Sequence, residues 1–236
     1  MSVYDSRIVR FLKRFRPVVV GLQNTQRYLG LLARPHMVSR YLKAHRVRKL
    51  QIGSNICVLP GWLNTDLYPA SLRSVTLDAT QRFPFDGASF DYVFSEHQIE
   101  HIRFDDSLAM LRECHRILRP GGKIRIALPS ANPLLELFGP SRTELQNRYI
   151  HEKTKLLYPN AFKPSPCFAL NAASMNWGHK FLYDNETLCC VLQNVGFTHV
   201  RFFAPGESDD ANFTGIESRT SDIDRYETVV AQATRP

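Results

Sequence analysis

The chain has 236 residues, of which 44% are hydrophobic, and it carries a formal net charge of +8. This composition is sufficient for a buried core and excludes a disordered tail or a fibre, and no apolar run approaches the roughly 20 residues that cross a bilayer. The five cysteines are odd in number and lack metal-ligand spacing, so we expect free thiols and a cytoplasmic protein.

The positive charge is concentrated at the amino terminus. Residues 1–50 hold 12 Lys and Arg against one acid, which leaves a net charge of −3 for residues 51–236. Apolar and basic side chains fall on opposite sides of a helix over residues 7–16, so this segment predicts a basic amphipathic helix. Pro17 is expected to end or kink that helix.

The amino-terminal segment has two interpretations that stay open. A basic amphipathic helix binds anionic surfaces, which would place residues 7–16 on lipid at the inner face of the membrane, or on nucleic acid. The same pattern fits a solvated helix that packs its apolar side on the domain. A second helix is expected over about 22–44, and its pattern is that of a helix that simply packs on the domain. We therefore predict a helical extension, residues 1–46, followed by a domain, residues 47–236.

Strands and helices alternate along this domain. Short apolar segments bounded by polar or turn residues predict seven strands, at 49–53, 62–67, 74–78, 90–95, 123–128, 197–204 and 226–233. Asp105 or Asp106 is expected to cap a helix after the fourth strand, and residues 119–122, with two glycines and a proline, are expected to end it.

The carboxyl-terminal half is expected to contain an insertion. Six of the fourteen prolines lie between residues 129 and 166, so we predict an irregular insertion with a little helix over about 130–180. A helix should follow, capped by Asp184 and ended by Gly196. This order of elements predicts an α/β fold with a Rossmann-like, doubly wound, mostly parallel sheet of seven strands, which binds ligands at the carboxyl ends of its strands.

Polar residues follow the ends of the first four predicted strands. Gly53, Ser54 and Asn55 come directly after the first strand, where a glycine lets the backbone approach a ligand. Asp66 ends the second strand, where a carboxylate can accept both hydroxyl groups of a ribose. After the third strand Asp78 can accept from an adenine amine, and residues 95–97 end the fourth. These positions converge on one edge of the sheet and predict a nucleoside site.

The glycine pattern indicates a nucleoside without a bound pyrophosphate. A dinucleotide would need Gly-x-Gly-x-x-Gly at the start of a full helix, whereas this segment has only Gly53 and Gly61. Eight residues, 54–61, separate the first predicted strand from the second, which is too few for an ordinary crossover helix. A phosphate-free nucleoside therefore fits better.

Six segments of the sequence, in the same order along the chain, resemble one family, the class I S-adenosylmethionine-dependent methyltransferases of the type 11 branch. They are Leu50-Gln51-Ile52-Gly53-Ser54-Asn55, Leu59 to Asp66, Phe83-Pro84-Phe85, Ser89-Phe90-Asp91-Tyr92-Val93, Glu100-His101 and Leu118-Arg119-Pro120-Gly121-Gly122. The resemblance implies S-adenosylmethionine as cofactor, with its methionine part at residues 53–55, its ribose at Asp66 and its adenine at Asp78. The full set of cofactor-binding candidates is Gly53, Ser54, Asn55, Asp66, Leu67, Asp78, Ala79 and Ser95.

Asn55 stands where this family usually has glycine. Asn is among the residues that tolerate the left-handed conformation, so the loop can keep its shape. Asp66 and Asp78 also have a plain structural interpretation, as caps of turns at strand ends.

His97 to His101 read His-Gln-Ile-Glu-His, which matches an inverted zinc-protease pattern with two imidazoles on one helical face. Similar methyltransferases carry the Glu-His pair without metal, so we expect none here. His97 is instead a catalytic candidate, as the acceptor of a proton from a hydroxyl or amine. Both histidines serve equally well as helix caps or packing groups.

The predicted topology brings residues 177–183 to the same edge, because the insertion starts and the following helix begins there. His179 is then a second catalytic candidate. Trp177 and Tyr183 are candidates for substrate binding, with Trp177 able to stack on a flat or sugar-like acceptor. The alternative is that these aromatic residues only pack the insertion onto the domain.

These observations predict an S-adenosylmethionine-dependent O- or N-methyltransferase for a small-molecule, sugar or lipid-linked acceptor. One alternative is a weak or inactive relative that works as an adaptor through its basic segment. Another is an RNA methyltransferase. This alternative is less favoured, because the sequence lacks the Asn-Pro-Pro-Tyr signature of enzymes that methylate base amino groups. The sequence does not indicate an oligomeric state.

Overall fold

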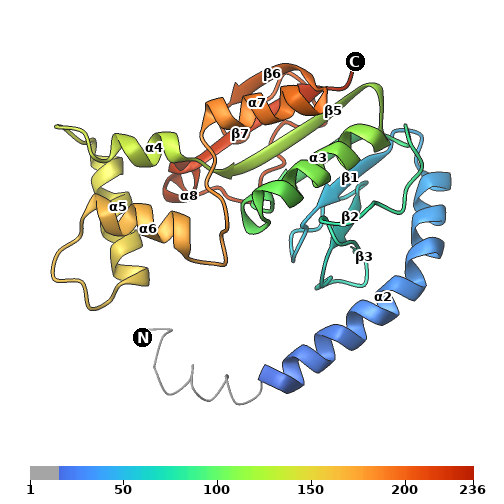
Figure 1. The fold of residues 1–236 in the computed structure, drawn as a ribbon, viewed down its shortest axis with the longest axis horizontal. Coiled ribbons are helices and arrows are strands. Elements are labelled where there is room, and N and C mark those ends of the chain that lie inside the picture. The colour runs from blue at the N-terminus through green and yellow to red at the C-terminus, as the bar shows by residue number, and fades with distance from the viewer. Residues whose placement is uncertain (1–15) are drawn as a thin grey trace.

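The computed structural model describes residues 16–236 (Figure 1). The basic helix expected over residues 7–16 therefore lies outside the described residues except for its last position. Within the described residues, helix α2 spans Arg16–Ala44. The helix expected over about 22–44 is confirmed.

All seven strands belong to one sheet. They are β1 (Lys49–Ile52), β2 (Leu63–Asp66), β3 (Val75–Thr76), β4 (Phe90–Glu96), β5 (Leu118–Pro129), β6 (Thr198–Phe203) and β7 (Thr228–Thr234). Their spatial order is β3-β2-β1-β4-β5-β7-β6, and only the pairs that involve β7 are antiparallel. The expected Rossmann-like, mostly parallel sheet is confirmed, with a switch in strand order between β1 and β4 that opens a ligand site at their carboxyl ends.

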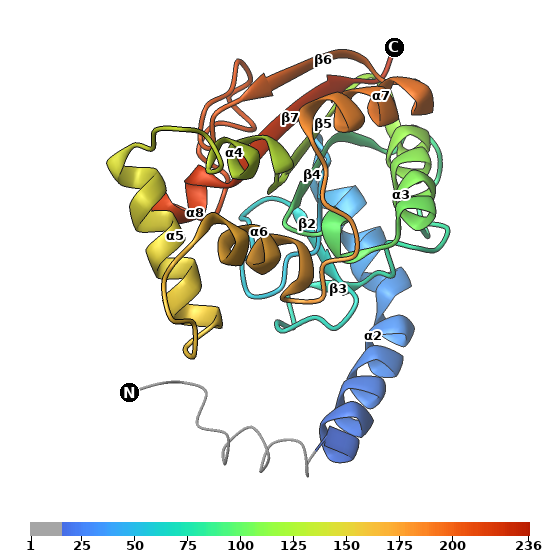
Figure 2. The same ribbon diagram turned by 60° about the vertical axis from the view of Figure 1, so that its left-hand side comes forward.

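Helices α3 (Phe104–Ile117) and α7 (Asn185–Val195) lie side by side on one face of the sheet (Figures 1 and 2). The predicted cap of α7 is confirmed, because Asp184 accepts a hydrogen bond from the Thr187 backbone N–H at 2.7 Å. The predicted cap of α3 is wrong. Its N-cap is Arg103, and Asp105 and Asp106 lie in the first turn, where their charge complements the helix dipole.

The insertion is more helical than expected. It contains α4 (Ala131–Glu136), α5 (Glu144–Leu157) and α6 (Pro166–Met175), which lie at the carboxyl end of β5 (Figure 2). The proline count was misleading because Pro166 occupies the first helical turn, where proline is tolerated. These helices, with α8 (Asp222–Tyr226), share a second small core that includes Leu134, Tyr149 and Ile223.

The main core lies between the sheet and its helices. Leu50, Phe90, Val93, Met110 and Ile126 are at most 1% exposed. Parallel strands covered on both faces bury nearly every side chain, which is why the strands read as short apolar runs in the sequence. This core fixes the edge of the sheet on which the polar loops stand.

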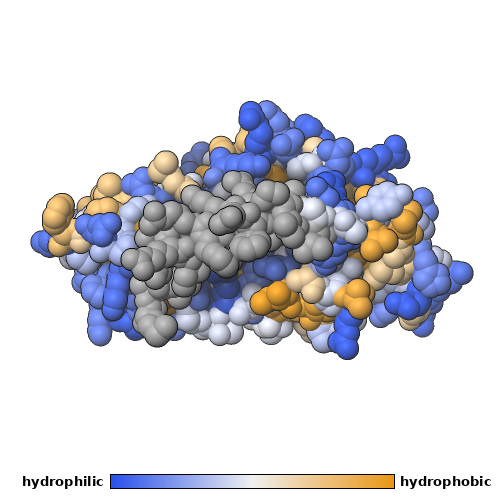
Figure 3. Space-filling model, turned by 90° about the horizontal axis from the view of Figure 1, so that it is seen from below, coloured by the Kyte–Doolittle hydropathy of each residue, from blue (hydrophilic) through white to orange (hydrophobic). Residues whose placement is uncertain are grey.

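Helix α2 extends away from the sheet beyond β3 (Figure 1). Several of its apolar side chains are exposed to solvent. Tyr28 is 63%, Leu29 59% and Leu32 63% exposed. Seen from below, apolar groups interrupt an otherwise polar surface (Figure 3). No helix within residues 16–236 combines the length and apolarity needed to cross a membrane.

Asp210 makes the stability of the fold depend on pH. Its carboxylate accepts hydrogen bonds from Lys123 Nζ at 2.8 Å and from the Asn212 backbone N–H at 3.0 Å. Burial alone would raise the pKa of Asp210, but these bonds hold it at about 2, below the usual 3.8. Since the folded-state pKa is depressed, this stabilisation is fully present above about pH 4 and is lost as the pH falls toward 2.

We therefore expect Asp210→Asn to destabilise the chain at pH 7 by roughly 1 to 2 kcal/mol. Urea unfolding at pH 7 and at pH 3 measures the effect, and the two proteins should differ less at pH 3. The matched control is Asp209→Asn, because Asp209 is an exposed neighbour paired with Arg201. An equal loss at both pH values for Asp210→Asn would contradict this account.

Candidate functional site

A cleft of about 420 Å³ lies at the carboxyl edge of the sheet, and we call it the carboxyl-edge cleft. One side comes from the loop after β1 and the other from the helical insertion. Its lining includes Gly53, Ser54, Asn55, His97, His101, Lys153, Trp177, His179, Asp224 and Glu227. The structure thus brings together the predicted cofactor loop, both histidines proposed as catalytic and the predicted Trp177.

The loop after β1 exposes backbone toward this cleft. Gly53 has φ +73° and Asn55 has φ +44°, so Asn55 does adopt the left-handed conformation expected of it. The Asn55 backbone N–H donates to Asp66 Oδ2 at 2.8 Å, and Asp66 Oδ1 accepts from the Tyr68 N–H at 2.9 Å. The Asp66 carboxylate therefore ties the β1 loop to the end of β2, and its contact with a ribose stays a prediction.

Like Asp66, Asp78 stabilises the loop at the end of its strand through hydrogen bonds. Its Oδ1 accepts from the Thr80 backbone N–H at 3.1 Å and from the Thr80 hydroxyl at 2.7 Å, while Oδ2 lies 3.2 Å from Arg27 Nη2 of α2. Ala79 is buried. Asp66, Leu67, Asp78 and Ala79 lie along the same edge of the sheet, outside the lining of the carboxyl-edge cleft. Their roles toward an adenosine group remain predictions.

Tyr183 and Ser95 do not face the cleft. Tyr183 is fully buried, and its hydroxyl lies 2.6 Å from Ser107 Oγ of α3, so the prediction of a substrate-facing Tyr183 is wrong. The prediction that residues 177–183 lie at the carboxyl edge of the sheet is correct, since Tyr183 pairs with Ser130 at the end of β5. The Tyr183 side chain, however, points into the core. Ser95 on β4 is also fully buried, which keeps its hydroxyl away from a bound cofactor.

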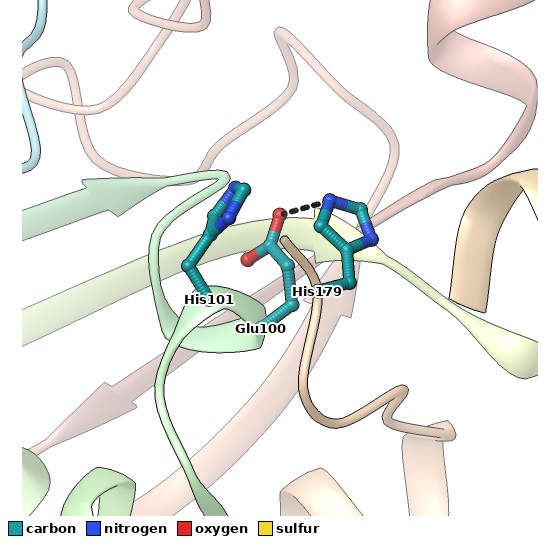
Figure 4. A group of neighbouring side chains, drawn as sticks. All are labelled: Glu100, His101 and His179. Carbon is teal, nitrogen blue, oxygen red and sulfur yellow. Dashed lines mark ion pairs between the residues drawn. The ribbon is translucent and has the colours of Figure 1, made fainter. Parts of the chain in front are cut away.

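Glu100, His101 and His179 form what we call the histidine cluster (Figure 4). Glu100 is fully buried, and His179 Nε2 lies 4.0 Å from its Oε1. The rings of His101 and His179 stand edge to face with centroids 4.7 Å apart. His97 contacts the cluster from the cleft side, with Nδ1 3.2 Å from Glu100 Oε1. Burial lowers the pKa of His101, although the Glu100 carboxylate opposes this shift.

The His-x-x-Glu-His segment does not form the helical face that its spacing suggested. Only a single 3-10 turn, η1 (Ile99–His101), is present, and His97 precedes it with φ +47°. His179 arrives from the insertion because the Glu100 carbonyl accepts hydrogen bonds from the backbone N–H groups of Lys180 and Phe181, at 2.7 and 3.3 Å. The imidazole of His179 thus joins those of His97 and His101 around Glu100.

The opposite wall contains a buried ion pair that the sequence did not point to. Lys153 Nζ of α5 lies 2.8 Å from Glu227 Oε1, and Glu227 also accepts from the Tyr149 hydroxyl. Burial, and then the Glu227 charge, raise the pKa of Tyr149 well above its usual range. Lys153 lies 5.4 Å from the centroid of the Trp177 ring, which is 48% exposed at the mouth of the cleft. Sequence reasoning missed Lys153 because its segment was expected to be irregular.

The sheet order and the glycine turn after β1 define a class I, Rossmann-like methyltransferase fold. Residues 37–126 match the family model described as a methyltransferase domain, the type 11 family. Over residues 37–126 the chain is therefore similar to methyltransferase domains of the type 11 family. The matched residues cover β1 to β4 and most of β5, the elements on which the resemblance in the sequence rests.

The chain is similar to demethylmenaquinone methyltransferases from two strains of Staphylococcus epidermidis, at 40% identity over 145 residues, which cover 58% of this chain and 54% of each relative. The chain thus spans about half the length of these curated relatives. Among solved structures, a SAM-dependent methyltransferase from Archaeoglobus fulgidus has a TM-score of 0.50 at 16% identity and covers 89% of this chain and 94% of that one. A possible histamine N-methyltransferase from Thermotoga maritima has a TM-score of 0.47 at 17% identity, with coverages of 98% and 97%.

Proposed function

We propose that the chain transfers a methyl group from S-adenosylmethionine to a nitrogen or oxygen atom of a small acceptor that enters the carboxyl-edge cleft. The observation that carries the proposal is this cleft, which joins the β1 loop to a wall of histidine and aromatic side chains. The similarity to a demethylmenaquinone methyltransferase supports a lipid-linked acceptor, such as the reduced form of a quinone with its two hydroxyl groups, over a sugar.

The β1 loop fits a nucleoside cofactor. A Cβ atom at Gly53 would lie 2.5 Å from Gln98 Oε1, so the loop has no room for a side chain and offers its backbone instead. The residues expected to hold the methionine part are Gly53, Ser54 and Asn55, with Asp66 at the ribose and Asp78 at the adenine. When bound, the cofactor supplies a methyl group on a positively charged sulfur.

The chain's own residues would then position the acceptor and take its proton. Trp177 presents a half-exposed ring on which a flat acceptor can stack. His97 can accept the proton, and the Glu100 carboxylate 3.2 Å from its Nδ1 would stabilise the imidazolium that forms. Methyl transfer is an in-line displacement, so much of the catalysis comes from holding the two reactants in line and excluding water.

A lipid-linked acceptor also gives the extension a role. We propose that residues 7–16 make peripheral contact with anionic lipid at the inner membrane face. The exposed apolar residues Tyr28, Leu29 and Leu32 support this, because the helix that follows this segment in the sequence also presents apolar side chains to solvent. RNA is the alternative partner, and binding to it would fall steeply with salt.

Calorimetric titration with S-adenosylmethionine and S-adenosylhomocysteine tests the proposed function. We expect micromolar binding by the full chain and at least tenfold weaker binding by Asp66→Ala, because the variant loses a ribose contact and releases the Asn55 N–H. Asp105→Ala, an exposed carboxylate in the first turn of α3, is the control and should bind as the parent chain does. A folded parent chain that binds neither compound would favour the adaptor alternative.

A further inference from the structure

Glu100, at the centre of the histidine cluster, is a fully buried carboxylate with few partners. Neither of its oxygens accepts a well-formed hydrogen bond from any residue that the structure describes, and the nearest groups that could be positively charged are the imidazoles of His97, with Nδ1 at 3.2 Å, and His179, with Nε2 at 4.0 Å. A buried carboxylate is normally hydrogen-bonded, paired with a positive charge or bound to a metal, since losing its hydration costs far more than a neutral group would lose. Glu100 therefore calls for a cation.

The tautomer of His179 indicates which kind of cation would pair with Glu100. Its Nδ1 lies 2.5 Å from the Ala173 carbonyl oxygen, and a carbonyl oxygen can only accept, so Nδ1 carries the proton. Nε2 then turns its lone pair toward Glu100 Oε1 at 4.0 Å. Histidines whose second nitrogen is fixed by a backbone carbonyl are typical metal ligands.

We propose that Glu100, His101 and His179 form a binding site for a divalent transition-metal ion, with Zn²⁺ as the best match to the ligand set. One donor atom from each residue lies within 4.8 Å of the others. Ligand atoms about 2.1 Å from one zinc ion lie roughly 3 to 4 Å apart, so side-chain movements on the order of 1 Å complete the site. Two imidazoles and one carboxylate are an established set for such ions.

The site has an open side. His101 and His179 both line the carboxyl-edge cleft, whereas Glu100 lies behind them. Three protein ligands leave at least one coordination position free, and that position faces the cleft. A metal there can bind an acceptor oxygen and favour its deprotonated, nucleophilic form. This last consequence rests on the proposed function, whereas metal binding itself does not.

The sequence led us to expect no metal, because similar methyltransferases carry the Glu-His pair without one, and the zinc-protease spacing would have used His97 and His101 as the two histidines. His97 instead stands beside Glu100 on the cleft side, with Nε2 3.4 Å from the Thr228 hydroxyl. The metal-ligand pattern depends on His179, which only the folding of the insertion brings to the cluster.

Metal binding to the full chain tests the proposal. The protein is stripped with a chelator, dialysed and titrated with Zn²⁺ under calorimetry, and Co²⁺ is added separately to read the ligand set from its visible absorption. We expect one equivalent of Zn²⁺ per chain and an increase in thermal midpoint on binding. Glu100→Gln and His179→Ala should each weaken Zn²⁺ binding by at least about tenfold and change the Co²⁺ spectrum. His151→Ala, an exposed histidine on α5, is the control and should bind unchanged.

Stoichiometric binding that Glu100→Gln and His179→Ala leave unchanged would overturn the proposal, as would the absence of Zn²⁺ binding by a folded parent chain. Glu100→Gln keeps the shape of the side chain and removes a buried charge, so it should fold, and circular dichroism confirms this. The experiments distinguish failure of the proposed methyltransferase function from failure of the proposed metal site. A chain that binds S-adenosylmethionine but not Zn²⁺ loses only the metal site, and one that binds only Zn²⁺ loses only the methyltransferase assignment.

Discussion

Glu217→Ala is expected to destabilise the chain by about 3 to 5 kcal/mol, because it leaves the Arg125 guanidinium buried without a counter-charge. Arg125 on β5 is fully buried, and its Nε lies 2.5 Å from Glu217 Oε1. Its Nη1 and Nη2 have no hydrogen-bond partner within residues 16–236. Glu217 also accepts from the Gly206 backbone N–H at 2.9 Å, so the loop before it would loosen too. Urea unfolding at pH 7 measures the loss.

A double variant separates the charge effect from a packing effect. Arg125→Met combined with Glu217→Ala removes both charges and should be more stable than Glu217→Ala alone. Glu207→Ala, an exposed carboxylate in the same loop, is the matched control and should unfold as the parent chain does. A double variant no more stable than the single one would show that packing, and not the unpaired guanidinium, dominates.

Gly53→Ala is expected to weaken S-adenosylmethionine binding roughly tenfold to a hundredfold. The added Cβ would meet Gln98 Oε1 at 2.5 Å and Gln98 Cβ at 3.0 Å, so the Gln98 side chain must turn away and the backbone at Gln98 or in the β1 loop must move by a few tenths of an ångström. Both lie against the carboxyl-edge cleft. Calorimetric titration of the folded variant with S-adenosylmethionine measures the change.

Gly61 offers a closely matched control. Its φ is +75°, near the +73° of Gly53, yet a Cβ there would meet nothing within 4 Å. Gly61→Ala therefore carries the same backbone strain without the contact, and it should retain most of the cofactor affinity. If both variants lose affinity equally, backbone strain and not the contact with Gln98 is the cause.

Local patterns were sufficient to predict most of the fold. The strands are short apolar runs closed by turn residues, and the helix between Asp184 and Gly196 is marked at both ends by residues that cap or stop helices. The left-handed conformation of Asn55 could also be expected, because it depends on the residue itself. Such features are set by neighbours in the sequence.

The candidate site depends on contacts that sequence spacing does not contain. Nothing near His179 in the sequence indicates that the Glu100 carbonyl binds the following N–H groups and places its imidazole in the cluster. Tyr183, four residues further on, was expected to face the cleft as well, but it is fully buried with its hydroxyl 2.6 Å from Ser107 Oγ, a long-range contact that the sequence does not indicate. Lys153 was missed because prolines that begin or separate helices were interpreted as signs of irregular chain.

The two walls of the carboxyl-edge cleft come from separate parts of the chain. The β1 loop and η1 form one wall. The other is formed by α5, by residues 177–179 after α6 and by residues 218–227 around α8, and the insertion is joined to the first wall through the backbone of Glu100. Substitutions in the insertion can therefore reshape the second wall while the glycine loop keeps its geometry. Such a division lets one half of the cleft diversify during evolution while the other half is held constant, and exchange of residues 130–180 between relatives is the corresponding route to altered acceptor choice.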